Sequence, residues 1–440
     1  MPEKIFFKKE FSMKKMTLSL FMVLCVLLLS VLTACQGATE PEAVTEAVSD
    51  ETTTGTTAAE PDDTPNTPDE PNQPTPEKPN EPNTPNEPNT PEQPNEPAEP
   101  SYPRPSELRT YELNEETAGI KILGERHLKV DGCITMDWTG AGIEFNADLN
   151  TESNVSFVAK SNALCYFKAY VDGLLWKNGT SNYFTVGTND TSIELKDVPA
   201  GKHVIRLIKA TGYTIAQASV SSVTLDGTIS ETAPAKKDLY IEYLGDSICC
   251  GWGIIGGHTG NWADQDGTLA YPYLVSQRLG ADYSITALSG KGMVVGTPNF
   301  KDNYLHASPL RSTEEEYDFA RQADIVVINL GTNDVGQHAN MATYREAYVA
   351  LLGQIFEKHG EDCVVYCLWG AMGDGFSYHV NTAISTYKQS NPKAKIYTLQ
   401  LEGSSVPGGA PSWGHPSRED NMKHTIALEA LITETYLSKQ

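Results

Sequence analysis

The sequence lacks the patterns that would define a metal site or a nucleic-acid surface. No Cys-x-x-Cys pair stands with a second such pair or with a histidine pair at zinc-binding spacing, so we expect no metal site. Six cysteines remain after residue 35, too scattered to form a disulfide scaffold. Basic residues are also scarce, with 26 against 39 acidic residues over positions 106–440. This surplus of negative charge argues against binding to nucleic acid.

Large apolar side chains are almost absent from residues 36–105. This stretch holds 17 of the 27 prolines, in a repeat that reads EPNTPNEPNTPEQPNEP, and 16 acidic residues against 2 basic ones. Such a segment buries too little surface to offset the entropy cost of ordering. We predict a disordered, self-repelling linker over 36–105.

A hydrophobic run lies near the N-terminus. Lysines between positions 8 and 15 precede an apolar stretch from Leu18 to Leu32, which is the layout of a secretory signal. The stretch ends in LTAC, which resembles the lipobox of bacterial lipoproteins, with Cys35 as the acylated residue. An uncleaved membrane anchor is the alternative, although the run is short for a span of about 20 residues. We expect a signal peptide over 1–35, a lipid anchor at Cys35 and a location on the extracellular cell surface.

The remaining chain divides by its hydrophobic period. Residues 106–232 alternate, as in Ile143, Phe145 and Ala147 with Glu144 and Asn146 between them, and turn signals separate the short runs. This pattern predicts an antiparallel β-sandwich of jelly-roll type. Residues 238–440 instead hold five short, nearly continuous apolar runs: LYIEYL, YSITAL, DIVVINL, CVVYCLW and KIYTL. Helical segments lie between or after them: YPYLVSQRL, TYREAYVALLGQIFEKHG, YHVNTAISTYKQ and REDNMKHTIALEALITETYL. This pattern predicts a doubly wound parallel sheet.

Polar motifs follow the apolar runs of the second domain, where ligand sites of parallel sheets lie. Gly245-Asp246-Ser247 follows the first run, Gly290 lies after the second, and Asn333 lies in GTND after the third. His415 stands before the last helical segment. The order of these four motifs indicates one site rather than coincidence.

The residue types suit ester hydrolysis, which needs a nucleophile, a base and donors for an oxyanion. Ser247 directly follows a strand, and a helix beginning after it would point the Ser247 amide at developing negative charge. Gly290 lets its N–H approach a substrate closely, and Asn333 can donate from a neutral amide. His415 titrates near neutrality and can carry the serine proton.

The four motifs resemble those of the GDSL/SGNH hydrolases, and the chain from about residue 107 onward resembles carbohydrate esterase family 2. The matching stretches are GDSICCGWG, AYPYLVSQRLGADYSITALSGKGMV, GTND and HPSREDNMKH, with AGKHVIRLIKATGYTIAQASVSSVTLDG in the first domain. The resemblance implies a three-layer α/β/α sandwich with a five-stranded parallel sheet, preceded by a jelly-roll domain. It also implies acetyl esterase activity on plant polysaccharides without a cofactor.

The acid of a full triad is missing from its usual place. SGNH hydrolases usually carry it three residues before the histidine, where this chain has Ser412, and no Asp or Glu occurs from Gly403 to Ser417. The resemblance to family 2 implies a Ser247–His415 dyad whose imidazole is held by a backbone carbonyl. A distant acid such as Asp374 is one alternative, and an inert hydrolase retained as a binder is another.

Other residues near the motifs have simpler readings. Cys249 and Cys250 are expected to pack in the core, with a catalytic thiol as the alternative. Asp246 and Asp334 are expected to brace their loops, and His424 to be structural. Trp252, Trp369 and Trp413 are candidate sugar contacts, because indole faces suit sugar rings. Core packing is an equal alternative for Trp252 and Trp369, whereas Trp413 is expected at the rim of the site.

We therefore predict an exported carbohydrate O-acetyl esterase acting on acetylated xylan, mannan or glucomannan. Ser247 attacks the acetyl carbonyl, the Ser247 and Gly290 N–H groups and Asn333 hold the oxyanion, and His415 transfers the proton. We expect a monomer with a polysaccharide or oligosaccharide partner. One alternative is an esterase on O-acetylated cell-wall sugars or lipids, and another is a non-catalytic carbohydrate-binding surface protein.

Overall fold

The computed structural model describes residues 101–130, 132–256, 262–403 and 414–439, which all belong to one compact unit, Glu92–Gln440. The predicted signal peptide, the predicted lipid anchor and nearly all of the predicted linker lie outside these residues. Within the described part of the chain, no helix is long and apolar enough to cross a membrane. The predicted domain boundaries stay predictions.

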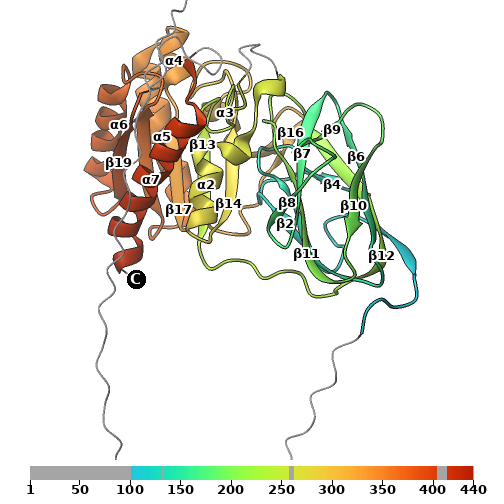
Figure 1. The fold of residues 1–440 in the computed structure, drawn as a ribbon. Coiled ribbons are helices and arrows are strands. Elements are labelled where there is room, and N and C mark those ends of the chain that lie inside the picture. The colour runs from blue at the N-terminus through green and yellow to red at the C-terminus, as the bar shows by residue number, and fades with distance from the viewer. Residues whose placement is uncertain (1–100, 131, 257–261, 404–413, 440) are drawn as a thin grey trace, which may run out of the picture. The chain divides into compact units, whose positions relative to one another are not determined.

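The first part of the described chain consists of antiparallel strands (Figure 1). We call residues 108–229 the β-domain. Its strands are β1 (Leu108–Glu112), β2 (Ile120–Leu123), β3 (Lys129–Val130), β4 (Cys133–Thr135), β5 (Gly142–Leu149), β6 (Ser153–Ser161), β7 (Cys165–Val171), β8 (Leu174–Trp176), β9 (Phe184–Val186), β10 (Thr191–Val198), β11 (Gly201–Lys209) and β12 (Ala218–Ile229).

Strand β12 connects the two halves of the β-domain. Its first residues pair with β6, where Ala218 lies opposite Ser161, and its last residues pair with β5, where Gly227 lies opposite Leu149. Gly227 has a φ of 144°, and a Cβ there would lie 2.1 Å from the Asp148 carbonyl oxygen. A glycine is therefore required where β12 passes from one partner to the other.

The predicted alternation of β5 is confirmed on one face only. Ile143, Phe145 and Ala147 are buried as expected. Glu144, expected to point outward, is buried too, because its carboxylate accepts a hydrogen bond from Arg206 Nε at 2.6 Å. The ion pair thus stabilises Glu144 in a buried position, although the alternating pattern predicts that it is exposed.

The second part of the chain forms the predicted parallel sheet. Its strand order is β14-β13-β17-β18-β19, and all pairs are parallel. The five strands are those expected from the apolar runs: β13 (Tyr240–Gly245), β14 (Asp282–Ala287), β17 (Ile325–Asn329), β18 (Val364–Gly370) and β19 (Lys395–Leu401).

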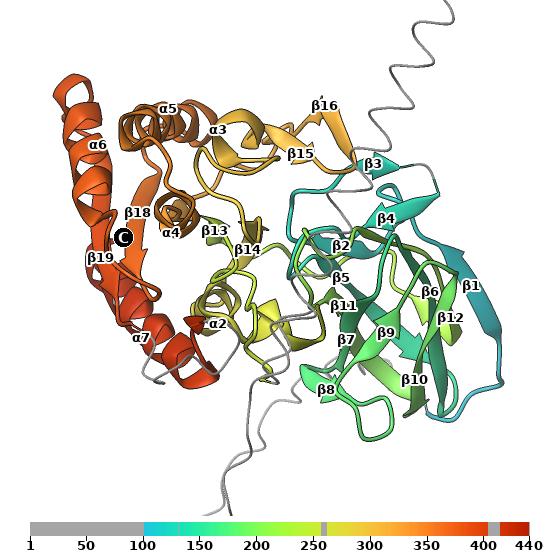
Figure 2. The same ribbon diagram turned by 90° about the horizontal axis from the view of Figure 1, so that it is seen from above.

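Helices cover both faces of this sheet. Ile325 and Val327 of β17 pack in one cluster with α2 and α7, whereas Val326 and Ile328 pack in another with α5 and α6. Figure 2 shows the two helix pairs on opposite sides of the strands. These helices match the predicted segments: α2 (Tyr271–Arg278), α5 (Met341–His359), α6 (Ser377–Ser390) and α7 (Arg418–Thr435).

Several short elements were not predicted. The strands β15 (His306–Ser308) and β16 (Ser312–Glu316) form a separate hairpin, α3 (Phe300–Asn303) precedes it, and α4 (Thr332–Gly336) follows β17. Ser247 is followed by turns and not by a helix. Gly251 has a φ of 66° there, in the left-handed region, and a Cβ on it would lie 2.4 Å from the Asp266 carbonyl oxygen, so the turn requires a glycine.

A buried arginine joins the β-domain to β13, the second strand in the order of the parallel sheet. Arg126, which follows β2, places Nε 3.0 Å from Glu242 Oε1 on β13. Both side chains are fully buried. The guanidinium also lies 4.7 to 5.0 Å from three aromatic ring centroids, those of Tyr304, Tyr317 and Phe319. This geometry combines an ion pair with cation–π contacts.

His359 completes the surroundings of Glu242. Its Nδ1 accepts a hydrogen bond from the Ala323 N–H at 2.9 Å, so Nε2 carries the proton that is donated to Glu242 Oε2 at 2.9 Å. Burial favours the neutral acid, but Arg126 and His359 outweigh burial and lower the pKa of Glu242 to about 2. Glu242 is therefore held as a buried carboxylate.

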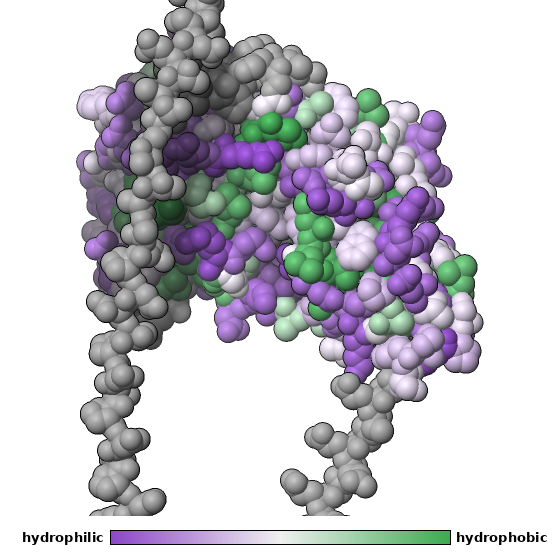
Figure 3. All heavy atoms as spheres, viewed as in Figure 1, coloured by the Kyte–Doolittle hydropathy of each residue, from purple (hydrophilic) through white to green (hydrophobic). Residues whose placement is uncertain are grey.

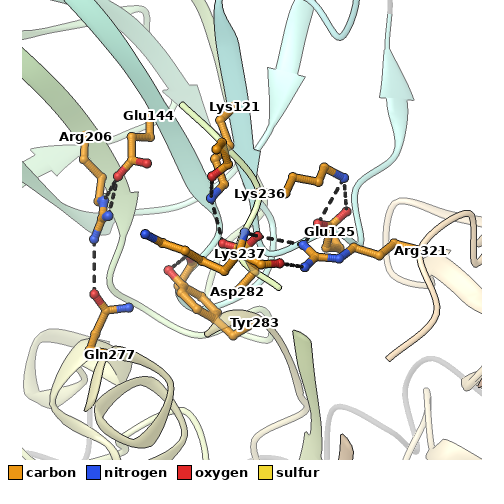
Figure 4. Close-up of polar contacts among 12 residues, drawn as sticks. Lys121, Glu125, Glu144, Arg206, Lys236, Lys237, Gln277, Asp282, Tyr283 and Arg321 are labelled. Atoms are coloured by element: carbon orange, nitrogen blue, oxygen red, sulfur yellow. Dashed lines mark hydrogen bonds and ion pairs between the residues drawn. The ribbon is translucent and has the colours of Figure 1, made fainter. Parts of the chain in front are cut away.

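Further ion pairs cross the same contact (Figure 4). Lys121 of β2 and Arg321 both bind Asp282 at the start of β14, each at 2.7 Å. Arg321 also donates to Glu125 at 3.0 Å. The hairpin β15–β16 adds a fully buried contact, because Ser308 donates to Asp137 Oδ2 at 2.6 Å. The β-domain is thus attached through charges at several points.

The face drawn in Figure 3 is mainly hydrophilic, with hydrophobic residues in separate groups. The most exposed large hydrophobic side chains of the described residues include Leu108, Leu174 and Tyr378. Scattered apolar residues of this kind are ordinary for a protein surface.

We expect Arg126→Met to lower the free energy of unfolding by about 3–5 kcal/mol, because it leaves Glu242 buried without its cation. Urea denaturation at pH 7 measures this. Arg278→Met is the control, since Arg278 pairs with Glu429 at 2.6 Å on the surface, where such pairs contribute about 1 kcal/mol or less. Similar small losses for both variants would contradict a special role for Arg126.

Candidate active site

Ser247 lies just beyond the carboxyl end of β13, the strand that pairs with both β14 and β17. Its side chain is mostly buried, with 6% of the residue surface exposed. Gly245 ends the strand, and a Cβ there would lie 2.1 Å from Cys249 Sγ. The sequence Gly-Asp-Ser therefore makes room for the turn that carries Ser247 to the end of the sheet.

His415 meets Ser247 from the other end of the domain. Its Nε2 lies 2.8 Å from Ser247 Oγ, and the histidine is also 6% exposed. This is the distance of a hydrogen bond between a nucleophile and its general base. The structure thus brings together two side chains that are 168 positions apart in the sequence.

The start of α7 positions His415. Ser417 and Asp420 form a capping box: the Asp420 N–H donates to Ser417 Oγ, and the Ser417 N–H donates to Asp420 Oδ2. Asn421 donates to the Pro416 carbonyl at 3.2 Å and accepts from the Tyr271 N–H at 3.0 Å. Asn421 therefore links the histidine segment to α2, a role that sequence reasoning did not assign.

Asn333 lies in the first turn of α4 and is already hydrogen-bonded. Its Nδ2 donates to the Lys291 carbonyl at 2.9 Å and to Asp246 Oδ2 at 3.1 Å. Gly331 before it has a φ of 142° and lies against Phe376, where a Cβ would meet the ring at 2.3 Å. The amide is thus placed next to the Ser247 turn, with both of its hydrogens directed at acceptors.

Gly290 lies at the open side of the same region. It is exposed, has a φ of 75°, and a Cβ on it would meet no atom within 4 Å. Gln337 donates to the Gly290 carbonyl at 3.1 Å, which ties this turn to the end of α4. The geometry leaves open space beside Gly290, as the close approach of a substrate requires.

The Asp334 side chain braces the loop after β14, as expected from the sequence. Its two oxygens accept hydrogen bonds from the Met293 N–H at 2.8 Å and the Val294 N–H at 2.9 Å. A Cβ on Gly292 would lie 2.3 Å from Asp334 Oδ2, so glycine is needed for this approach. Burial raises the pKa of Asp334, and the backbone N–H groups oppose that rise.

Asp246 is fully buried beside Ser247. Its Oδ1 accepts from the Ile248 N–H at 3.0 Å, and its Oδ2 accepts from Asn333. Burial, helped by the nearby Asp334, raises the pKa of Asp246 to about 7, and its hydrogen bonds to Ile248 and Asn333 limit the rise. Asp246 therefore titrates near neutrality next to the side chains of the site.

The two cysteines after Ser247 lie in the core, as expected. Both are fully buried; Cys249 Sγ lies 3.2 Å from Tyr271 Oη, and Cys250 Sγ lies 3.6 Å from the Ser247 carbonyl oxygen. Burial raises the pKa of both thiols, to about 12 for Cys250. Neither thiol is therefore poised as a thiolate nucleophile.

The three candidate tryptophans have different surroundings. The half-buried Trp252 has its ring centroid 6.5 Å from that of His415, so it lies beside the site. Trp369 is half-buried on β18 and packs against the hydrophobic core. Trp413 lies outside the described residues. His424 is buried and its Nε2 lies 2.9 Å from the Glu402 carbonyl, which agrees with a structural role.

The described residues do not supply the missing acid in an obvious place. Asp374, the distant candidate, is exposed in the loop between β18 and α6, whereas His415 is buried. Ser412 and its neighbours lie outside the described residues. In the described part of the chain there is also no group of three or more His, Cys, Asp or Glu side chains that could hold a metal ion.

Comparison with known proteins agrees with this geometry. Residues 243–430 match the GDSL-like Lipase/Acylhydrolase family. The chain is 26% identical over 319 residues to the cellulase/esterase CelE of Acetivibrio thermocellus, covering 68% of this chain and 37% of CelE. It is 22% identical over 331 residues to the acetylxylan esterase / glucomannan deacetylase of Cellvibrio japonicus, covering 71% of this chain and 87% of that enzyme. The chain thus spans just over a third of CelE.

Solved structures share the fold. A family two carbohydrate esterase from Clostridium thermocellum, solved with cellohexaose, has a TM-score of 0.65 at 23% identity and covers 72% of this chain and 98% of its own. An acetyl xylan esterase from Butyrivibrio proteoclasticus has a TM-score of 0.66 at 18% identity and covers 74% of this chain and 98% of its own. The predicted SGNH-type fold of the second domain is confirmed.

We expect the Asp246→Asn variant to differ from the parent in how stability depends on pH. The acid has a pKa of about 7 when folded and about 3.9 when unfolded, so its stabilising proton is fully present below pH 4 and lost as pH rises to 7. The parent should lose about 1.4 kcal/mol per pH unit relative to the variant over this range. Denaturation curves from pH 4 to 8 measure this.

Asp362→Asn is the control, because Asp362 is exposed and pairs with Lys395 on the surface. The difference in unfolding free energy between this variant and the parent should stay the same from pH 4 to 8. A difference in unfolding free energy between the parent and Asp246→Asn that stays constant from pH 4 to 8 would contradict a raised pKa at Asp246.

Proposed function

We propose that the chain is a carbohydrate O-acetyl esterase, because residues 243–430 match the GDSL-like Lipase/Acylhydrolase family and the chain is similar to family 2 carbohydrate esterases. The observation that carries the proposal is the 2.8 Å contact between Ser247 Oγ and His415 Nε2 beyond the end of β13. The proposed substrates follow from the names of two relatives, which mention acetylated xylan and glucomannan. Acetylated mannan stays a prediction from the sequence.

In the proposed reaction, His415 Nε2 takes the Ser247 proton while Ser247 Oγ forms a bond to the acetyl carbon. The carbonyl π pair moves to oxygen, which gives a tetrahedral oxyanion. Collapse breaks the bond to the sugar oxygen, and His415 returns the proton to that oxygen as the alcohol leaves. Water then repeats the sequence on acetyl-Ser247 and releases acetate.

The oxyanion is proposed to be held by the Ser247 and Gly290 N–H groups and by the Asn333 amide. Asn333 already donates to Asp246 Oδ2 at 3.1 Å, the longer of its two contacts. We propose that the oxyanion shares or replaces Asp246 as the acceptor of this hydrogen. Donors that are fixed before the substrate arrives stabilise the transition state at little reorganisation cost.

A Ser247–His415 dyad is proposed in place of a triad. The support is that no Asp or Glu occurs from Gly403 to Ser417, and that the alternative, Asp374, is exposed. The capping box and Asn421 hold the backbone at Pro416 and Ser417, directly after His415, so the imidazole needs less help from a carboxylate to keep its orientation.

The wider architecture is proposed as follows. The antiparallel pairing and the non-sequential strand order β10-β6-β12-β5-β11-β7-β8 support a jelly-roll β-domain. The lysines, apolar run and LTAC motif before residue 36 support export and a lipid anchor at Cys35. The proline-rich acidic segment would then hold a monomeric enzyme away from the membrane.

Acetate release from acetylated xylan and acetylated glucomannan tests the activity. We expect the full chain to release acetate from at least one of them, and Ser247→Ala and His415→Ala each to lower the rate by at least about 10³-fold, as in other serine hydrolases. Cys250→Ala is the matched control in the same turn and should keep most of the activity, because its thiol is buried and protonated.

Failure of the parent chain to release acetate from both polysaccharides and from a small acetyl ester would refute the esterase. Loss of activity in Cys250→Ala at full stability, with Ser247→Ala still active, would instead identify a thiol nucleophile.

A further inference from the structure

Three aromatic side chains form a row next to the loop that follows Ser247, with Tyr166 stacked on Tyr183 and tilted against Trp262. Tyr166 lies on β7, Tyr183 precedes β9, and Trp262 begins the short helix η1 (Trp262–Asp264). The ring centroids of Tyr166 and Tyr183 are 4.6 Å apart at 26°, and those of Tyr166 and Trp262 are 4.7 Å apart at 54°. We call this group the aromatic stack. It joins rings from the β-domain to a ring from the hydrolase domain.

A buried ion pair holds the aromatic stack in place. Tyr183 Oη donates to Asp266 Oδ2 at 2.8 Å, and Lys168 Nζ binds the same oxygen at 2.5 Å. The other Asp266 oxygen accepts from the Thr268 N–H at 2.9 Å. Asp266 and Lys168 are both buried. Rings held this rigidly lose little conformational entropy when a ligand covers them.

Hydrogen bonds connect the aromatic stack to the turn that carries Ser247. The Asp266 N–H donates to the Gly251 carbonyl at 3.2 Å, and the N–H of the next residue, Trp252, donates to the Ser247 carbonyl at 3.0 Å. The Trp252 ring centroid lies 6.5 Å from that of His415. In Figure 2, β7 lies on the side of the β-domain that faces α2.

The aromatic stack is more exposed than a second aromatic pair, Trp138 and Tyr213, which packs between the two domains. Trp138 and Tyr213 lie 4.1 Å apart at 15°, both are at most 1% exposed, and both are hydrogen-bonded to the hairpin β15–β16 segment. Tyr166, Tyr183 and Trp262 are each only half-buried. The aromatic stack therefore keeps aromatic surface available to a ligand.

We propose that Trp262, supported by Tyr166 and Tyr183, is a sugar-binding subsite for the units of the polysaccharide next to the acetylated one. An aromatic face matches the apolar face of a sugar ring, and a rigid stack fixes the direction in which the chain leaves Ser247. The β-domain is then part of the substrate site, because it supplies the support for Trp262. This inference rests on the proposed function, since it needs a polysaccharide at Ser247.

Binding of xylohexaose and cellohexaose to the full chain carrying Ser247→Ala tests the subsite without catalysis. We expect the added change Trp262→Ala to raise the Kd, measured by calorimetry, about fivefold to tenfold for at least one hexasaccharide. Trp262→Tyr should restore most of the affinity. Trp176→Ala is the matched control, because Trp176 is a half-buried tryptophan on β8 of the same β-domain, and it should leave the Kd unchanged.

Three results would overturn the subsite: no binding of either hexasaccharide, equal Kd values with and without Trp262, or an equal loss from Trp176→Ala. A kinetic comparison adds a second readout in the chain with Ser247 intact. Trp262→Ala should lower the ratio of kcat/KM for acetylated polysaccharide to kcat/KM for a small acetyl ester, chiefly through KM. Acetate release by the parent decides the proposed function separately from the binding result.

Discussion

The buried pair between Arg126 and Glu242 is the contact on which the arrangement of the site depends. Glu242 lies on β13, the strand whose end carries Ser247, and β13 pairs with both of its neighbours in the sheet. A carboxylate is stable inside a parallel sheet only when a cation and hydrogen-bond donors surround it. Here the cation comes from the β-domain. The strand whose end carries Ser247 therefore depends on a residue of the β-domain, Arg126, to neutralise its buried carboxylate.

Hydrogen bonds from the backbone organise the other side of the site. Two buried acids adjoin Asn333: Asp334 follows it in the sequence, and Asp246 accepts a hydrogen bond from its side chain. Their described partners are N–H groups of Ile248, Met293 and Val294 together with the Asn333 amide. Two loops and a helix start are thereby fixed relative to one another. The amide of Asn333 can then be positioned accurately although it lies on a short helix.

Much of the hydrolase domain could be predicted from the sequence. Its five strands read as nearly continuous apolar runs because both faces of the sheet are covered, and the motifs follow those runs because parallel strands end at one edge. The order of the motifs predicted that Ser247 and His415 lie together, and the structure places Ser247 Oγ 2.8 Å from His415 Nε2. The pattern could not show the role of Asn421, because this side chain acts through hydrogen bonds to two backbone groups, the Tyr271 N–H and the Pro416 carbonyl.

Two features that the pattern could not predict share a physical cause. Glu144 is buried because Arg206 pairs with it, and Gly251 has a left-handed φ where the Asp266 carbonyl oxygen lies against it. Each involves a contact between residues far apart in the sequence. Local periodicity carries no information about such contacts, so only the folded structure reveals them.

The ion pair and the aromatic rings around the Arg126 guanidinium limit how the two domains can be separated by gene recombination. A gene fusion that moved the hydrolase domain alone to a new partner would carry the buried Glu242 carboxylate without the arginine that neutralises it. We therefore expect the two parts of the chain to be inherited as a pair, with position 126 constrained by position 242 rather than by substrate.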